Sequence, residues 1–167
     1  MPLEIVSRKE WGANPPKFVK KVGKAVNFVI IHHTATPQCD TTEQCIASLS
    51  SIQKVHQNTN GWSDIGYNFI VGGDGKVYEG RGFNVIGGHA SQFNAKSIGI
   101  SLIGNWNDAV PGQNMLRATQ EIIDFAVEEG HLASNYQLHG HRQVSQILCP
   151  GNALFNEIKD WPHFPGK

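Results

Sequence analysis

The chain has 167 residues, of which 40% are hydrophobic, enough for one substantial core but too few residues for two typical domains. Fourteen basic and fourteen acidic residues cancel, so no net positive field is available to attract nucleic acid or anionic lipid. No apolar run reaches the roughly 18 residues of a membrane span, and the first residues lack a secretory signal pattern. We therefore expect one domain over residues 1–167, either cytosolic or a mature form whose leader is not included.

The first strongly predicted element is a buried β-strand at residues 26–31, VNFVII. This run is almost entirely apolar and rich in β-branched residues, which is typical of a central strand. The strand would place His32 and His33 at its end.

A helix is predicted after Cys45, because the apolar residues Leu49 and Ile52 recur with helical spacing until the NTNGW segment. His56 lies on the same apolar stripe. We interpret it as a part-buried, hydrogen-bonded histidine and not as a ligand.

The remaining elements predict an α/β fold. Two β-rich runs, YNFIV and KVYEG, flank residues 72–75 (GGDG) and predict a β-hairpin. A buried strand follows at residues 97–104, where Gly99 would allow close approach of backbone. An amphipathic helix ending near Gly130, a short strand at YQLHGH and a closing helix ended by Pro162 complete the chain. This order predicts a mixed β-sheet with helices packed on its faces.

The three cysteines form an odd set. Cys39 and Cys45 lie six positions apart at the start of the predicted helix, where Thr41 and Thr42 offer N-caps. A disulfide between them would close a small loop and indicate an oxidising compartment, whereas two free thiols are the alternative in the cytosol. In both cases Cys149 has no cysteine partner within the chain.

Four of the eight histidines fall in two clusters at predicted strand ends. Neighbouring strand residues point to opposite faces, so only one of His32 and His33 can reach a given ion, whereas His139 and His141 could share a face. With Cys149 they offer imidazole and thiolate ligands that suit zinc, and three protein ligands would leave a fourth position for water. A four-ligand structural site and a metal-free loop with a buried thiol remain alternatives.

Two further segments carry chemically useful side chains. Tyr67 follows a glycine at the start of a predicted strand, where its phenol could reach a cleft; simple packing is the alternative. Residues 78–90 combine Arg81, Phe83 and His89 with several glycines. Such a loop indicates that something approaches its backbone, and a flexible surface loop is the alternative.

Along nearly its whole length the chain resembles the peptidoglycan recognition proteins, which are related to phage-lysozyme-type zinc amidases (N-acetylmuramoyl-L-alanine amidases). The resemblance is carried by SRKEWGA, VIIHHTAT, the Cys39 and Cys45 pair, GWSDIGYNFIVGGDGKVYEGRGFNVIGGHA, NAKSIGISLIGNW, GHRQVSQILCPG and FNEIKDWPHF. It is greatest to the amidase-active insect members. The resemblance implies a central mixed β-sheet flanked by three α-helices, with a groove over a zinc ion.

The resemblance also assigns roles to single residues. It implies that His32, His141 and Cys149 bind zinc and that Tyr67 is the catalytic tyrosine. It implies the family disulfide between the other two cysteines, Cys39 and Cys45. The implied groove residues are His33, Trp62, Arg81, Phe83, His89 and Asn94, with Phe83 as an apolar floor for the peptide.

The implied activity is hydrolysis of the amide bond between N-acetylmuramic acid and L-alanine by a zinc-activated water, with peptidoglycan or muropeptides as partners. Ile147 departs from the family pattern, because related amidases carry Thr or Lys there as a donor to the developing oxyanion. Losing one such donor costs on the order of 2.7 to 4 kcal/mol, a drop of roughly a hundred- to a thousandfold in rate. We therefore predict an intact zinc site with a reduced rate.

Two other functions compete with this interpretation. One is a peptidoglycan-binding immune receptor with weak or no catalysis, and the other is a structural zinc protein without a ligand groove. We also expect a monomer. The disulfide and the family habit imply a secreted protein, with a cytosolic form as the alternative, and the family implies a role in innate immunity by scavenging or damping immune signalling.

Overall fold

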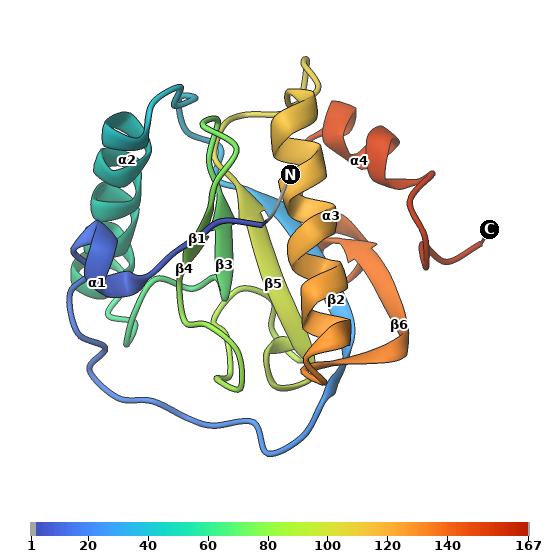
Figure 1. Cartoon of the computed structure of the whole chain (residues 1–167), viewed down its shortest axis with the longest axis horizontal. Helices are drawn as coiled ribbons and strands as arrows, with labels where there is room; N and C mark the ends of the chain where they lie inside the picture. The colour runs from blue at the N-terminus through green and yellow to red at the C-terminus, as the bar shows by residue number, and fades with distance from the viewer. Residues whose placement is uncertain (1–2, 167) are drawn as a thin grey trace.

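A central six-stranded β-sheet organises the protein, for which the computed structural model describes residues 3–166 (Figure 1). The strands lie in the order β1, β4, β3, β5, β2, β6. Their bounds are β1 Ile5–Val6, β2 Val26–His33, β3 Phe69–Val71, β4 Val77–Glu79, β5 Ser97–Leu102 and β6 Leu132–Gly140. β2 runs parallel to β5 and β6, whereas β3 and β4 form the predicted antiparallel hairpin, so the sheet is mixed, as predicted.

Within residues 3–166, four α-helices accompany the sheet. They are α1 Arg8–Trp11, α2 Thr42–Lys54, α3 Gln113–Glu128 and α4 Asn152–Ile158. The three longer helices are those that the sequence predicts, and Figure 1 shows α3 lying across β5 and β2 while α2 stands beside the hairpin. α1 is an additional single turn, closed by a reciprocal capping box between Ser7 and Glu10.

Two apolar clusters lie on opposite faces of the sheet. Along β3, Phe69 packs with α3 and α4, whereas the next residue, Ile70, packs with α2. Val29 and Ile31 of β2 belong to the cluster with α3 and α4. Because side chains alternate along a strand, His32 points to the other face, the one on which α2 lies. On that face α2 lies beside β3 and β4, away from β6 (Figure 1).

The ends of several elements differ from the predictions. The strand predicted at residues 97–104 ends at Leu102, where its partner strand β3 also ends. The last strand begins at Leu132, before the YQLHGH segment. The closing helix ends at Ile158, and Trp161 packs in the core just beyond it.

A π-helical turn, Val55–Thr59, follows α2 where the sequence predicts a continuous α-helix. His56 lies in this turn, and its Nδ1 accepts a hydrogen bond from the backbone N–H of Gly66 at 2.9 Å. His56 is therefore part-buried and hydrogen-bonded, as predicted, although its ring belongs to a wider turn than expected.

The predicted disulfide between Cys39 and Cys45 is present at the start of α2, with the two Cα atoms 5.1 Å apart. Thr41 caps the helix by accepting a hydrogen bond from the backbone N–H of Gln44 at 3.2 Å. Cys149 is a free, buried thiol, as the odd count requires.

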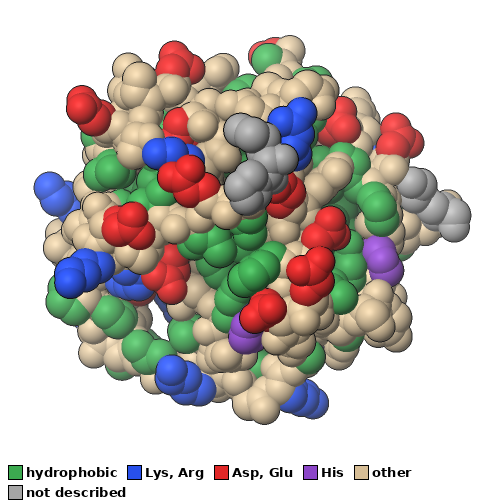
Figure 2. All heavy atoms as spheres, in the orientation of Figure 1, with side chains coloured by type: hydrophobic (Ala, Val, Ile, Leu, Met, Phe, Trp, Pro, Cys, Tyr) green, Lys and Arg blue, Asp and Glu red, His purple; other side chains and the backbone are tan. Residues whose placement is uncertain are grey.

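On the face shown in Figure 2, acidic and basic side chains are interspersed. Within the described residues, none of the helices combines the length and the apolar character needed to cross a membrane.

Candidate metal centre and groove

Three side chains from distant parts of the chain converge above the sheet. His32 lies near the end of β2, His141 directly follows β6, and Cys149 directly precedes the turn into α4. One ligand atom from each lies within 4.8 Å of the others, and His32 Nδ1 is 3.6 Å from Cys149 Sγ. A nitrogen and a sulfur at the usual distances from a tetrahedral zinc ion are about 3.5 Å apart. The spacing therefore suits zinc.

The polar atoms of this cluster also need the partner that an ion would supply. His141 Nδ1 is buried and has no hydrogen-bond partner among the described residues. Burial, followed by neighbouring histidines, holds the pKa of His32 well below its usual value, so its imidazole is neutral and can coordinate. Cys149 Sγ accepts a hydrogen bond from the backbone N–H of His33 at 3.3 Å. Without a metal, burial raises the pKa of this thiol to about 12, whereas a coordinated thiol is deprotonated.

The second histidine of each pair is engaged elsewhere. His33 Nδ1 accepts a hydrogen bond from the backbone N–H of Trp106 at 3.1 Å. His139 Nε2 lies 3.2 Å from the side-chain oxygen of Gln137. The described residues thus form a three-ligand cluster, which favours an open site over the four-ligand alternative.

The loop before α4 holds Cys149 in place. The backbone N–H of Arg142 donates to the carbonyl oxygen of Cys149 at 2.8 Å, and its guanidinium donates to Asn152 Oδ1 at 2.9 Å. Gly151 has a φ of 98°, and a Cβ there would lie 2.4 Å from the backbone of Trp106. A glycine is therefore required directly after the cis Cys149–Pro150 bond.

Tyr67 lies beside the cluster, two residues before β3. Its ring centre is 5.3 Å from that of His32. Burial, followed by the charge of Cys149, raises the pKa of its phenol to about 12, so the hydroxyl stays protonated at neutral pH. Tyr67 therefore keeps a hydrogen-bond donor in the lining of the cavity over the three ligands.

Three neighbouring cavities form a continuous groove. The cavity over the ligand cluster has a volume of about 440 Å³. It shares Trp62 and His89 with a second cavity of about 510 Å³, which in turn shares Phe18 and Arg81 with a third of about 350 Å³. Besides the ligands and Tyr67, the side chains of the first cavity include His33, His56, Trp62, His89, Ile147 and Leu148.

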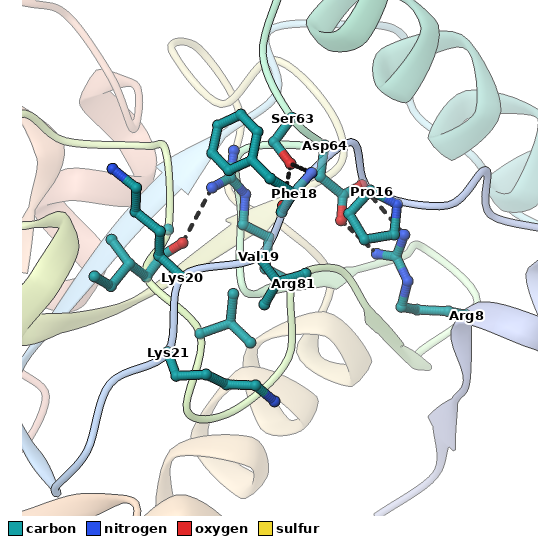
Figure 3. A pocket seen from close by; sticks show the side chains of 12 residues that line it. Arg8, Pro16, Phe18, Val19, Lys20, Lys21, Ser63, Asp64 and Arg81 are labelled. Atoms are coloured by element: carbon teal, nitrogen blue, oxygen red, sulfur yellow. Dashed lines mark hydrogen bonds and ion pairs between the residues drawn. The ribbon is translucent and has the colours of Figure 1, made fainter.

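The third cavity is the basic end of the groove (Figure 3). Arg8, Lys20, Lys21 and Arg81 line it, and among the described residues only Arg8 has an acidic partner, Asp64, at 2.9 Å. Arg81 Nε donates to the carbonyl oxygen of Ile65 at 2.8 Å, and Nη1 donates to that of Ile86 at 3.0 Å. Its guanidinium is thereby held between two backbone segments.

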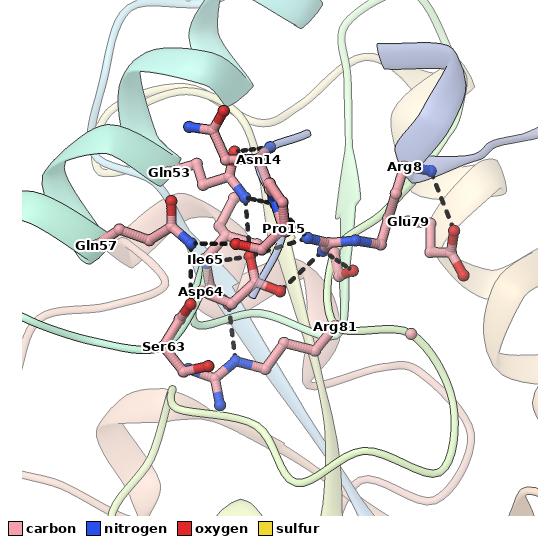
Figure 4. A network of polar contacts seen from close by, with 12 residues as sticks. Arg8, Asn14, Pro15, Gln53, Gln57, Ser63, Asp64, Ile65, Glu79 and Arg81 are labelled. Carbon is pink, nitrogen blue, oxygen red and sulfur yellow. Dashed lines mark hydrogen bonds and ion pairs between the residues drawn. The ribbon is translucent and has the colours of Figure 1, made fainter. Parts of the chain in front are cut away.

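A buried polar network supports this end of the groove (Figure 4). Asp64 Oδ1 accepts hydrogen bonds from Gln53 Nε2 at 2.9 Å and from the backbone N–H of Ile65 at 2.8 Å. Gln53 also exchanges two hydrogen bonds with the backbone of Asn14. The network ties the N-terminal segment, α2 and the groove wall into one unit.

Five of the six groove residues implied by the resemblance line these cavities. They are His33, Trp62, Arg81, His89 and Asn94. Phe83 does not, and the expectation that it forms an apolar floor is wrong. The centre of its ring lies 4.2 Å from that of His131, on which it stacks, and 4.6 Å from that of Phe69. The ring also packs against the core that includes α3.

Ile147 lies at the mouth of the first cavity beside Leu148, and the two side chains are 49% and 68% exposed. Neither side chain can donate a hydrogen bond. The sequence analysis does not identify His56 and Phe18 as lining residues, nor Arg8, Lys20 and Lys21 of the basic cavity. The apolar and basic run KFVKK is the only signal for Phe18, and the place of His56 on an apolar stripe indicates a structural role alone.

Comparison with known proteins agrees with this geometry. The N-acetylmuramoyl-L-alanine amidase family matches residues 22–152. Peptidoglycan-recognition protein SC1a of Drosophila melanogaster is 49% identical over 162 residues, which cover 97% of this chain and 88% of that protein.

Two solved structures are similarly close. Wild-type Drosophila PGRP-LB superposes with a TM-score of 0.96 at 47% identity, covering 98% of this chain and 96% of that one. A point mutant of Drosophila PGRP-LB in complex with tracheal cytotoxin gives a TM-score of 0.95 at 47% identity, covering 96% and 95%. The fold and the cluster define an amidase-type domain. The chain belongs to the insect-type peptidoglycan-recognition protein family.

Proposed function

We propose that this protein is a zinc-dependent N-acetylmuramoyl-L-alanine amidase that acts on bacterial peptidoglycan or muropeptides. The observation that carries the proposal is the three-ligand cluster of His32, His141 and Cys149 at the floor of an open cavity. A structural zinc site would be closed by a fourth protein ligand, whereas a catalytic one keeps a position free for water or substrate.

The chain's own residues have distinct parts in this reaction. A bound zinc ion supplies Lewis-acid chemistry for amide hydrolysis near neutral pH. His32, His141 and Cys149 would hold it at the end of β2. Tyr67, protonated and beside the ligands, would donate a hydrogen bond to the scissile carbonyl or hold the attacking water. Ile147 occupies the position of a second donor and cannot act as one.

The groove accounts for substrate binding in this proposal. Trp62 at its centre offers an aromatic surface beside the ligand cluster, and the basic end at Arg81 offers positive charge to the carboxylates of a stem peptide. The PGRP-LB mutant that is 47% identical was solved with tracheal cytotoxin bound, which supports a muropeptide as the ligand.

A receptor that binds peptidoglycan but cleaves it slowly or not at all is the second candidate. The observation that favours it is Ile147, an aliphatic side chain at the mouth of the cavity where the resemblance leads us to expect a donor. The Cys39–Cys45 disulfide supports an oxidising compartment, and we propose a secreted protein of innate immunity under either function.

Mass spectrometry of a defined muropeptide separates the two candidates. The muropeptide carries an intact lactyl-L-alanine bond and is incubated with zinc-loaded protein, with chelated protein and with Cys149→Ser. Release of the stem peptide by the zinc-loaded protein alone supports the amidase. Retained binding without release in any sample supports the receptor and contradicts the amidase.

A further inference from the structure

A line of hydrogen bonds leads from the η2 loop (3₁₀ helix Asn94–Lys96) to the ligand His32. Ser97 Oγ lies 2.7 Å from the carbonyl oxygen of Phe93 and 3.2 Å from His89 Nε2. His89 Nδ1 lies 2.8 Å from His32 Nε2. Ser97, His89 and His32 are all buried, so these atoms have each other as partners in place of water.

The direction of every bond in this line follows from one carbonyl group. A carbonyl oxygen can only accept, so the single hydroxyl hydrogen of Ser97 is donated to Phe93. Ser97 Oγ must then accept from His89, which places the ring hydrogen of His89 on Nε2. A neutral imidazole carries one such hydrogen, so His89 Nδ1 is an acceptor.

The hydrogen bond between His89 and His32 decides which tautomer His32 adopts. Because His89 Nδ1 accepts, His32 must carry its hydrogen on Nε2. The Nδ1 lone pair of His32 is then free, and this is the atom that lies 3.6 Å from Cys149 Sγ. The other tautomer would place a hydrogen between the histidine and the cysteine, where it would exclude an ion.

We propose that Ser97 and His89 are positioning residues that fix the tautomer and the ring orientation of His32 for metal binding. The proposal rests on the proposed zinc site but not on catalysis. Partners of this kind behind a metal-binding histidine commonly hold its tautomer and raise metal affinity. The resemblance places His89 among the substrate contacts, whereas here both of its ring nitrogens are already used by the protein.

Two glycines and the backbone of the loop that carries His89 also fix the position of its ring. A Cβ on Gly99 of β5 would lie 2.4 Å from Cδ2 of His89, and one on Gly87 would lie 2.5 Å from the same atom. Asn94 Oδ1 accepts hydrogen bonds from the backbone N–H groups of His89 and Ala90, both at 2.8 Å. Asn94 therefore fixes the loop that carries the ring, and the two glycines leave the space that the ring fills.

Nitrogen-15 NMR of the metal-free protein tests the proposal directly. We expect the long-range ¹H–¹⁵N spectrum of the wild type to show His32 as the Nε2–H tautomer. His89→Phe removes the acceptor and should give a mixture of tautomers. His89→Asn keeps a carbonyl oxygen near the position of Nδ1 and should restore the Nε2–H form.

Zinc affinity, measured by competition with a chelator, provides the second readout. We expect His89→Phe to lower affinity by roughly 10- to 100-fold and His89→Asn to recover most of the loss. Ser97→Ala should lower it in the wild type and change nothing further in His89→Phe, since Ser97 acts through His89. If His89→Phe does not fold, Ser97→Ala alone carries the test, again through the His32 tautomer and zinc affinity.

An Nδ1–H tautomer of His32 in the wild type, or unchanged zinc affinity in a folded His89→Phe, would overturn the proposal. These outcomes are independent of turnover. A protein that binds zinc and shows the expected tautomer but releases no peptide would disprove the amidase and leave the positioning role standing.

Discussion

The backbone N–H of His33 donates a hydrogen bond to Sγ of Cys149 at 3.3 Å, which joins the end of β2 to the loop before α4. His33 thereby contributes to the metal site through its backbone, while its side chain faces the groove. Hydrogen bonds of this kind favour a thiolate over a thiol. In the metal-free protein burial outweighs this bond and raises the pKa of the thiol to about 12, so the sulfur becomes negatively charged only when a metal binds.

Cys149→Ser should abolish tight zinc binding while preserving the fold. A hydroxyl is a poor zinc ligand compared with a thiolate, so we expect a loss larger than the roughly 10- to 100-fold that outer partners contribute. Competition with a chelator measures the affinity, and muropeptide binding by calorimetry serves as the control because the groove is unchanged. Zinc binding equal to that of the wild type would remove Cys149 from the ligand set.

Ile147→Thr should raise the turnover number. A threonine hydroxyl at the mouth of the cavity could donate to the developing oxyanion, and one such donor is worth roughly a hundred- to a thousandfold in rate. Leu148→Thr is the matched control, since Leu148 is exposed in the same cavity one residue further on. An unchanged rate in Ile147→Thr, or an equal rise in both variants, would show that Ile147 does not limit the rate.

Tyr67→Phe should lower kcat by roughly a hundredfold or more with little change in KM, because the lost hydrogen bond forms mainly in the transition state. The ring, its packing on His32 and zinc affinity should be retained. Steady-state kinetics on the defined muropeptide measures both constants. A rise in KM alone would indicate that Tyr67 binds substrate and takes no part in the chemical step.

The metal-free protein should lose stability as pH falls from 6.5 towards 4. Burial, followed by the charge of Arg81, lowers the pKa of His56 to about 4, so below pH 6.5 the unfolded chain takes up a proton that the folded chain does not. The expected contribution is less than about 1.4 kcal/mol per pH unit, since the ring is only part-buried. Urea unfolding at pH 7 and pH 5 measures it.

His56→Asn is the matched variant for this pH dependence. Asparagine can still accept the hydrogen bond from Gly66 but does not titrate. We expect its stability to fall less between pH 7 and pH 5 than that of the wild type. Identical losses in the two proteins would show that His56 does not contribute.

The double variant Lys20→Gln with Lys21→Gln should weaken muropeptide binding by less than about tenfold, because exposed lysines contribute modest, screened attraction. The loss should shrink as salt is raised. Lys9→Gln with Lys54→Gln is the control, as these lysines lie outside the basic cavity. Equal weakening in both double variants would assign the effect to net charge and not to the cavity.

Five of the six strands and the three longer helices were predictable because their apolar patterns have the period of the element they form, whereas the two-residue strand β1 is too short to show one. Strand 26–31 and the helix over Gln113–Glu128 are examples. The convergence of His32, His141 and Cys149 was predictable only in part, since spacing left other metal and metal-free alternatives open and the resemblance selected the ligand set.

The remaining parts of the site could not be predicted because they depend on the geometry of loops. Phe83 lies in a polar, glycine-rich segment whose composition is typical of a binding loop, yet its ring packs against the core. The basic cavity joins Arg8, Lys20 and Arg81, which are far apart in sequence and are brought together only by the fold. No local pattern contains that information.

Gly99 contributes to the metal site because it has no side chain. An alanine there would place its Cβ 2.4 Å from the ring that orients His32. A designer who transfers these three ligands to another scaffold would therefore also have to transfer a strand with a glycine at this position beneath them. A search for related centres that compares side chains alone would pass over this requirement.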